Sequence, residues 1–388
     1  LEWLNSAYQD EYGGRTAESQ SCQDCHMSRG LESPEFDIDI EEIQTQVAII
    51  QDQTYPDAEN LVAHDKLHVR VRDRYSRHNF SGLNMFLVEM FNQFDDVLGV
   101  RKVDYMTGTE QIPHAKANFL LTAAKKTAQL DVETVAVSDR ELHATVKVQS
   151  LVGHRFPSGV GFRRAFLEVV ALDNSKAGDA AIVWGSGRTN ALGVILGANG
   201  EPLPSEFFER VGDQQQYQPH HEVIASENQA QIYETLLQNR SGQFTTSFIH
   251  GCETVKDNRL LPRGWSEAGP DPASLTGYFL KATYPRGVAW EDTNYRDGSG
   301  TDETLYKITL PAGVDPRQVT VRATLYYQSI PPYFLKAIFD TTPDTPAAKR
   351  LHFICSNLDL TGTPMENWKL KVVSATSPVS SRTARRPR

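Results

Sequence analysis

Apolar residues recur with two different periods along the chain, and the change falls near residue 130. Between residues 83 and 94 they recur at helical spacing, which predicts an amphipathic helix: Leu83, Phe86, Leu87, Met90, Phe91 and Phe94. The spacing between Ile40 and Ile50 predicts a short helix. Another is predicted from Pro113, because proline suits the start of a helix. Residues 1–130 are therefore expected to form a helix-rich region.

From about Val132 the period is two, which predicts β-strands. Leu142–Gln149 and the segment from Val319 alternate apolar and polar residues. Further candidates are separated by turn residues: Phe162–Leu172, Ala181–Gly187, Gln229–Leu237, Tyr278–Tyr284, Thr304–Leu310 and Trp368–Val373. Many short strands without helices between them favour an antiparallel β-sandwich. We predict an α+β protein with a helical region at 1–130, a β-sandwich domain at 131–376 that carries a helical insertion near 332–354, and a basic tail at 377–388.

Composition narrows the classes of function. The 388 residues include 39 basic and 49 acidic side chains and carry a net charge of −10, which argues against nucleic acid as the main partner. No stretch approaches the roughly 18 consecutive apolar residues of a transmembrane helix. We therefore expect a globular protein with no membrane-spanning helix.

One motif near the start of the chain carries specific chemistry. Cys22-Gln-Asp-Cys25-His26 has the Cys-x-x-Cys-His pattern of a c-type haem attachment site, in which two thiols bond to the haem vinyl groups and the histidine ligates the iron. A redox-active dithiol and half of a zinc site are the alternatives. No βαβ pattern precedes the motif, and no second Cys-x-x-Cys or His-x-His pair supplies further zinc ligands. We expect one covalent haem c, held by Cys22 and Cys25 with His26 as a ligand.

Such a linkage is made on the outer side of the cytoplasmic membrane, so a periplasmic or extracellular protein is expected. In an oxidising compartment the two remaining cysteines, Cys252 and Cys355, are a plausible disulfide. Two buried free thiols are the alternative. The adjacent His220 and His221 could suggest a metal pair, but neighbouring side chains point apart in an extended chain.

The residues alone do not decide which side chain is the second axial ligand of the iron. Met27 adjoins the proximal histidine and lies on the wrong side of the porphyrin. His78 stands just before the predicted helix at 83–94, and His154 lies in a turn at the end of a predicted strand. Both are candidates.

Several segments together resemble the multihaem c-type cytochrome family. Cys22–Met27 followed by Arg77-His-Asn-Phe-Ser-Gly-Leu-Asn84 is similar to its Cys-x-x-Cys-His-Met and His-x-Phe-x-Gly pattern. Gly153-His-Arg-Phe-Pro-Ser-Gly159 with Arg163-Arg164 is similar to a stretch of the β-rich domain that many members carry. Three shorter segments also look like that domain: Gln231–Glu234, Lys256–Pro262 and Tyr327–Pro332. The resemblance runs from about Leu1 to Tyr333.

The resemblance implies that the histidine of His-x-Phe-x-Gly is the distal haem ligand, a role that falls on His78 first and on His154 second. Family members carry several haem motifs and this chain has one, so partner haems in other proteins or subunits, in a homo- or hetero-oligomer, are implied. Electron transfer through a bis-histidine haem is the expected function. The alternatives are a haem enzyme with an open or weakly held sixth position and a secreted β-sandwich binding module with a structural metal.

Overall fold

The computed structural model describes residues 1–27, 78, 80–103, 105, 108, 110–273 and 275–380. It also describes the backbone of four short strands, which pair as two antiparallel hairpins: β1 (Leu31–Ser33) with β2 (Ile38–Ile40), and β3 (Val47–Ile49) with β4 (Arg70–Arg72). Two of these strands lie where the spacing between Ile40 and Ile50 predicts a helix. That prediction is wrong at Ile40 and at Val47–Ile49, and the residues between them lie outside the described part of the chain.

Two larger sheets form the centre of the molecule. One has the strand order β11 (Val223–Ile224), β16 (Thr301–Thr309), β6 (Glu141–Ser150) and β5 (Ala128–Ser138), with only the β11–β16 pair parallel. The other has the order β12 (Ile232–Tyr233), β7 (Arg164–Asp173), β17 (Val319–Gln328) and β18 (Leu370–Pro378), with β8 (Ile182–Ser186) also on β7. Within this second sheet all pairs are antiparallel.

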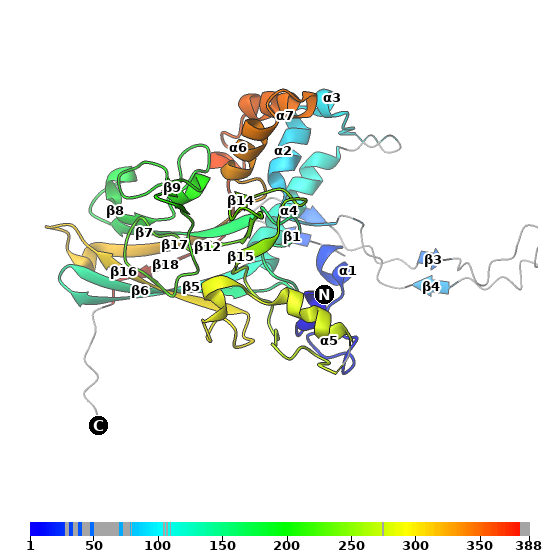
Figure 1. Cartoon of the computed structure of the whole chain (residues 1–388), viewed down its shortest axis with the longest axis horizontal. Coiled ribbons are helices and arrows are strands. Elements are labelled where there is room, and N and C mark those ends of the chain that lie inside the picture. Colours follow the sequence, from blue (N-terminus) through cyan, green and yellow to red (C-terminus); the bar gives the residue numbers. More distant parts are fainter. Residues whose placement is uncertain are drawn as a thin grey trace, which may run out of the picture.

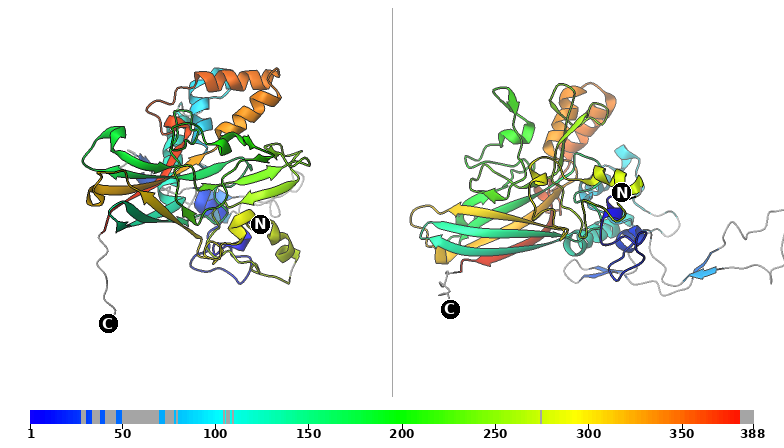
Figure 2. Two further views of the ribbon diagram at one scale, coloured as in Figure 1. Left: turned by 60° about the vertical axis from the view of Figure 1, so that its left-hand side comes forward. Right: turned by 60° about the horizontal axis from the view of Figure 1, so that its bottom comes forward.

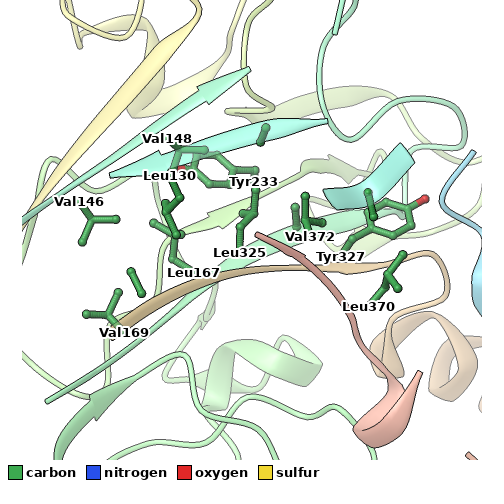
Figure 3. Packing of buried hydrophobic residues seen from close by; sticks show 14 of the residues in the cluster. Leu130, Val146, Val148, Leu167, Val169, Tyr233, Leu325, Tyr327, Leu370 and Val372 are labelled. Atoms are coloured by element: carbon green, nitrogen blue, oxygen red, sulfur yellow. The ribbon is translucent and has the colours of Figure 1, made fainter. Parts of the chain in front are cut away.

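The two sheets share one apolar core, which follows from the period-two pattern. Leu142, Ala144, Val146 and Val148 of β6 are all fully buried, and alternate residues of β16 and β17 are buried with them. Figure 3 shows side chains from both sheets meeting in this cluster. Strands 142–149, 304–310 and the strand from Val319 are therefore confirmed in β6, β16 and β17.

Helices gather beside the sheets. The predicted helix at 83–94 is α2 (Met85–Gln93), followed by α3 (Asp95–Leu98), and α4 (Gln111–Lys126) contains Pro113 in its first turn. The helical insertion consists of α6 (Pro332–Thr341) and α7 (Pro346–Asn357), which lie with α2 and α3 on one side of the sheets (Figure 1). The α+β class is thereby confirmed.

One predicted strand is helical. Tyr278–Tyr284 is taken up by α5 (Leu275–Phe279) and a 3₁₀ turn, η7 (Leu280–Thr283). A short apolar run fits a strand and a helical turn equally well, which is why its period misleads.

The remaining elements are short. They are η1 (Trp3–Asn5), α1 (Cys22–His26), η5 (Gly178–Ala181), η6 (Pro204–Phe207), β9 (Arg210–Val211), β10 (Gln214–Gln215), β13 (Thr235–Gln238), β14 (Phe244–Thr245), β15 (Glu253–Asp257), η8 (Gly287–Trp290), η9 (Pro316–Gln318) and η10 (Glu366–Trp368). Figure 1 and the right view of Figure 2 show α1 and the N-terminal residues beyond one end of the two sheets. Among the described residues, no helix combines the length and apolar character needed to cross a bilayer.

The predicted disulfide is absent. Cys252 and Cys355 are both free thiols. Cys252 is exposed just before β15, whereas Cys355 packs from α7 against the main core, where burial raises its pKa to about 12. The two cysteines belong to different parts of the fold, so the even count of leftover cysteines is not a pairing signal here.

Candidate functional site

The Cys-x-x-Cys-His motif forms a short capped helix, α1. The hydroxyl of Ser21 accepts a hydrogen bond from the backbone N–H of Asp24 at 3.2 Å, and the Asp24 carboxylate accepts from the Ser21 N–H at 2.9 Å. Residues three apart lie on the same side of a helix, so Cys22 and Cys25 share one face. Both are free thiols, and burial raises the pKa of the Cys25 thiol.

His26 ends α1 and is fixed by Ser81. Nδ1 of His26 lies 2.6 Å from the carbonyl oxygen of Ser81, and the backbone N–H of Ser81 donates to the carbonyl of His26 at 2.9 Å. A carbonyl can only accept, so Nδ1 carries the ring proton. This contact leaves Nε2 as the ring nitrogen that can bind a metal, with the second ring nitrogen tied to a backbone carbonyl as in many metal-binding histidines.

His154 has the same tautomer for the same reason. It lies in the connection between β6 and β7, and its Nδ1 is 3.0 Å from the carbonyl oxygen of Arg155. Burial lowers the pKa of His154 and outweighs the opposing effects of that hydrogen bond and of the Glu2 charge, so the imidazole is neutral near pH 7. Its Nε2 is likewise left with a free lone pair.

The two imidazoles lie next to each other. Their ring centres are 6.2 Å apart and their planes are parallel to within 5°. Imidazole nitrogens bind metal ions at about 2.0–2.1 Å, and roughly 1.1 Å separates such a nitrogen from its ring centre, so two imidazoles that bind one metal ion from opposite sides have centres about 6.2–6.4 Å apart. The ring-centre distance between His26 and His154 lies at the lower end of this range.

A cavity of about 410 Å³ adjoins the two histidines, a size typical of small-molecule and cofactor sites. Cys22, Cys25, His26 and His154 all line it. Trp3 and Tyr8 contribute aromatic walls, and Lys125 and Lys126, at the end of α4, contribute positive charge. The donor set, with two thiols and two imidazoles around one cavity, fits a covalently attached haem.

His78 lies elsewhere. Its side chain is exposed, its ring centre is 5.9 Å from that of Phe80, and it is not among the described residues that line the cavity. The structure thus brings four of the five predicted site residues together and leaves His78 outside the group. Ser81, Lys125 and Lys126 were not predicted, and Ser81 acts through its backbone, which leaves no side-chain signal in the sequence.

The adjacent histidines after β10, His220 and His221, contact different side chains. Nε2 of His221 pairs with the Gln218 side chain at 3.1 Å. His220 is buried, and its Nε2 lies 3.2 Å from an oxygen of Asp292 and 3.8 Å from one of Asp302. The three side chains of His220, Asp292 and Asp302 are close enough for their ligand atoms to reach one ion.

The hydrogen bonds around His220 nevertheless favour a histidine that donates from Nε2 rather than a metal ligand. The Gln231 amide oxygen accepts from the His221 N–H at 3.0 Å, which turns the amide nitrogen of Gln231 toward Nδ1 of His220 at 3.2 Å. Asn258 is oriented in the same way, with its nitrogen 3.4 Å from Nδ1. A metal-ligating histidine donates its second ring N–H to an acceptor, whereas here Nδ1 faces two donors.

Comparison with known proteins adds little. No protein-family model matches the chain, and no curated protein matches it. Among solved structures, the penta-heme cytochrome c552 from Thermochromatium tepidum aligns with 67% of this chain at 15% sequence identity and a TM-score of 0.34. The chain spans 41% of that protein's length.

Proposed function

We propose that the chain is an electron-transfer protein with one covalently attached haem c. Cys22 and Cys25 add across the two haem vinyl groups: each S–H bond is broken, and a carbon–sulfur and a carbon–hydrogen bond form, with no net oxidation or reduction. When bound, the haem supplies a one-electron iron couple. His26 and His154 are the residues that would hold the haem iron, each through Nε2.

The observation that carries this proposal is the pairing of His26 with His154 at 6.2 Å, with parallel planes and with both Nδ1 atoms tied to carbonyls. We assign the second ligand to His154 and not to His78 because only His154 lines the cavity beside α1. Two histidine ligands would leave no open position for a substrate on the iron, which suits electron transfer, and they would favour a lower potential than a histidine–methionine pair.

Partners follow from the proposal. A single haem exchanges electrons only with another redox centre, so we propose that this chain works with other haem proteins or haem-bearing subunits. The thioether linkage is made outside the cytoplasmic membrane, so the proposal includes export to the periplasm or the cell exterior.

The test uses the full chain expressed with a cytochrome c maturation system. Intact mass and a pyridine haemochrome spectrum are expected to show one covalent haem and a low-spin iron. His154→Ala is expected to give a high-spin haem that binds carbon monoxide, whereas His78→Ala stays low-spin. The opposite pattern would assign the ligand to His78, and a chain without covalent haem would overturn the proposed function.

The same spectra examine the haem-enzyme alternative. A parent protein that is high-spin, or that binds carbon monoxide at once, has an open sixth position and contradicts electron transfer by a bis-histidine haem.

A further inference from the structure

The N-terminal residues contact the loop that carries His154, through hydrogen bonds and an ion pair. The Glu2 carboxylate accepts a hydrogen bond from the backbone N–H of Arg155 at 3.2 Å and another from its guanidinium Nε at 2.8 Å. Arg155 is buried, and its Nη1 donates to Asp257 at 2.6 Å, which anchors the pair to the end of β15. Burial raises the pKa of Glu2, but the positive charges of Arg259 and Arg155 outweigh it, so the pKa is lowered and the carboxylate stays charged.

Arg155 passes this restraint directly to His154. Its backbone N–H is held by Glu2, and its backbone carbonyl holds Nδ1 of the His154 imidazole at 3.0 Å. The backbone of Arg155 thus binds Glu2 through its N–H and the His154 imidazole through its carbonyl.

A second contact secures the loop on the other side of His154. A Cβ atom on Gly153 would lie 3.0 Å from Cδ1 of Trp3 and 3.3 Å from Tyr8, so the loop packs against the N-terminal residues as closely as glycine allows. His154 therefore sits between a packed contact at residue 153 and an ion pair at residue 155.

We infer that Glu2 and Arg155 are positioning residues that keep His154 on the haem iron, and that their ion pair sets how often the sixth position opens. The inference rests on the proposed function, since it needs His154 as a ligand. It adds that the lifetime of the iron–His154 bond is controlled from the N-terminal residues and not only by the β6–β7 loop.

The magnitude follows from the chemistry of the pair. A hydrogen bond to a charged group contributes more than a neutral one, and loss of such a bond corresponds to a change of roughly tenfold in an equilibrium between a closed and an open loop. Glu2→Gln keeps the size and one acceptor oxygen but removes the charge, and Glu2→Ala removes both.

The experiment measures the rate of carbon monoxide binding to the reduced, haem-loaded full chain, because carbon monoxide binds only after His154 leaves the iron. Glu2→Ala is expected to bind roughly tenfold faster than the parent, with Glu2→Gln between them. In the oxidised, ferric protein the electron paramagnetic resonance spectrum is expected to show a growing high-spin fraction in the same order.

A matched control comes from the exposed pair of Glu18 with Arg263, which also joins the N-terminal residues to the rest of the fold, at 2.6 Å. Glu18→Gln is expected to leave the carbon monoxide rate unchanged. Equal rates in the parent, Glu2→Gln and Glu2→Ala would overturn the inference, and so would an equal increase in Glu18→Gln. If Glu2→Ala does not fold, Glu2→Gln decides.

Failure of the proposed function is recognised separately. In that case His154→Ala binds carbon monoxide no faster than the parent, whereas a failure of this inference alone leaves His154→Ala fast and the Glu2 variants slow.

Discussion

The backbone N–H and the backbone carbonyl of Ser81 both bind His26, although the two residues lie far apart in the sequence. The Ser81 N–H donates to the His26 carbonyl at 2.9 Å, and the Ser81 carbonyl lies 2.6 Å from Nδ1 of the imidazole. The backbone, and not the serine side chain, thus orients the histidine of the Cys-x-x-Cys-His motif.

Ser81→Ala is therefore expected to be mild. It removes the hydroxyl hydrogen bond to the His26 carbonyl at 3.2 Å, which costs about 1 kcal/mol of unfolding free energy, and it leaves the haem low-spin. Urea denaturation and an absorption spectrum check both points. A high-spin spectrum in this variant would contradict orientation by the backbone.

His154→Met is expected to raise the reduction potential of the haem. Methionine as axial ligand favours the ferrous iron relative to histidine. Redox titration of parent and variant measures the shift, and a low-spin spectrum shows that the methionine has bound. The same substitution at His78, outside the cavity, is expected to leave the potential unchanged.

Neutralising Lys125 and Lys126 is expected to lower the potential. Both lysines line the cavity, and removing positive charge near the iron favours the ferric state. The double variant Lys125→Gln/Lys126→Gln is compared with Lys147→Gln on β6, which is exposed and does not line the cavity. The shift is expected to shrink at high salt for the exposed Lys125. No difference between the two variants would show that the lysine charges do not act on the iron.

Lys116→Ala is expected to destabilise the fold. The Lys116 ammonium lies 2.7 Å from the carboxylate of Glu89, which is fully buried, so the pair links α4 to α2. Leaving a buried carboxylate without its partner costs about 3 kcal/mol. Urea denaturation measures this loss of unfolding free energy. Adding Glu89→Gln to the Lys116→Ala chain is expected to recover part of that free energy. The exposed pair Lys336–Asp340 is the control, where Lys336→Ala costs about 0.5 kcal/mol or less.

The fold is expected to lose stability as the pH falls below about 6.5, and His221 is one cause. Burial, helped by the charges of Lys256 and His220, lowers its pKa to about 4. Below pH 6.5 the imidazole of His221 is protonated in the unfolded chain but stays neutral in the folded chain. The free energy of unfolding therefore keeps its full value above pH 6.5 and declines toward pH 4, by roughly 3 kcal/mol in total from this residue. Urea denaturation at pH 7 and pH 5 checks it: His221→Gln is expected to lose about 2 kcal/mol less than the parent between these values.

Much of the fold can be predicted from local pattern. The strands around Leu142 and Val319 alternate cleanly because one face of each lies on the shared core. Tyr278–Tyr284 misleads because a run of seven residues is too short for its period to distinguish a strand from the helical turns of α5 and η7.

The site was predictable only where it is local. The cysteines and His26 lie within one helical turn, so their spacing alone predicts the chemistry. The loop of His154 reaches them through its contacts with Glu2 and Trp3, a long-range arrangement that the sequence around His154 does not reveal. His78 as ligand stays a prediction, and its exposed position speaks for His154.

The distribution of the site over the chain also sets an order of assembly. The two thiols and the first histidine belong to a five-residue segment that exists before any folding. His154 arrives only when the strands on either side of it have paired. If the chain carries the proposed haem, it can acquire that haem while unfolded and gain its His154 ligand only when the sheets close. The colour of the protein would then report, in real time, whether its β-structure has formed.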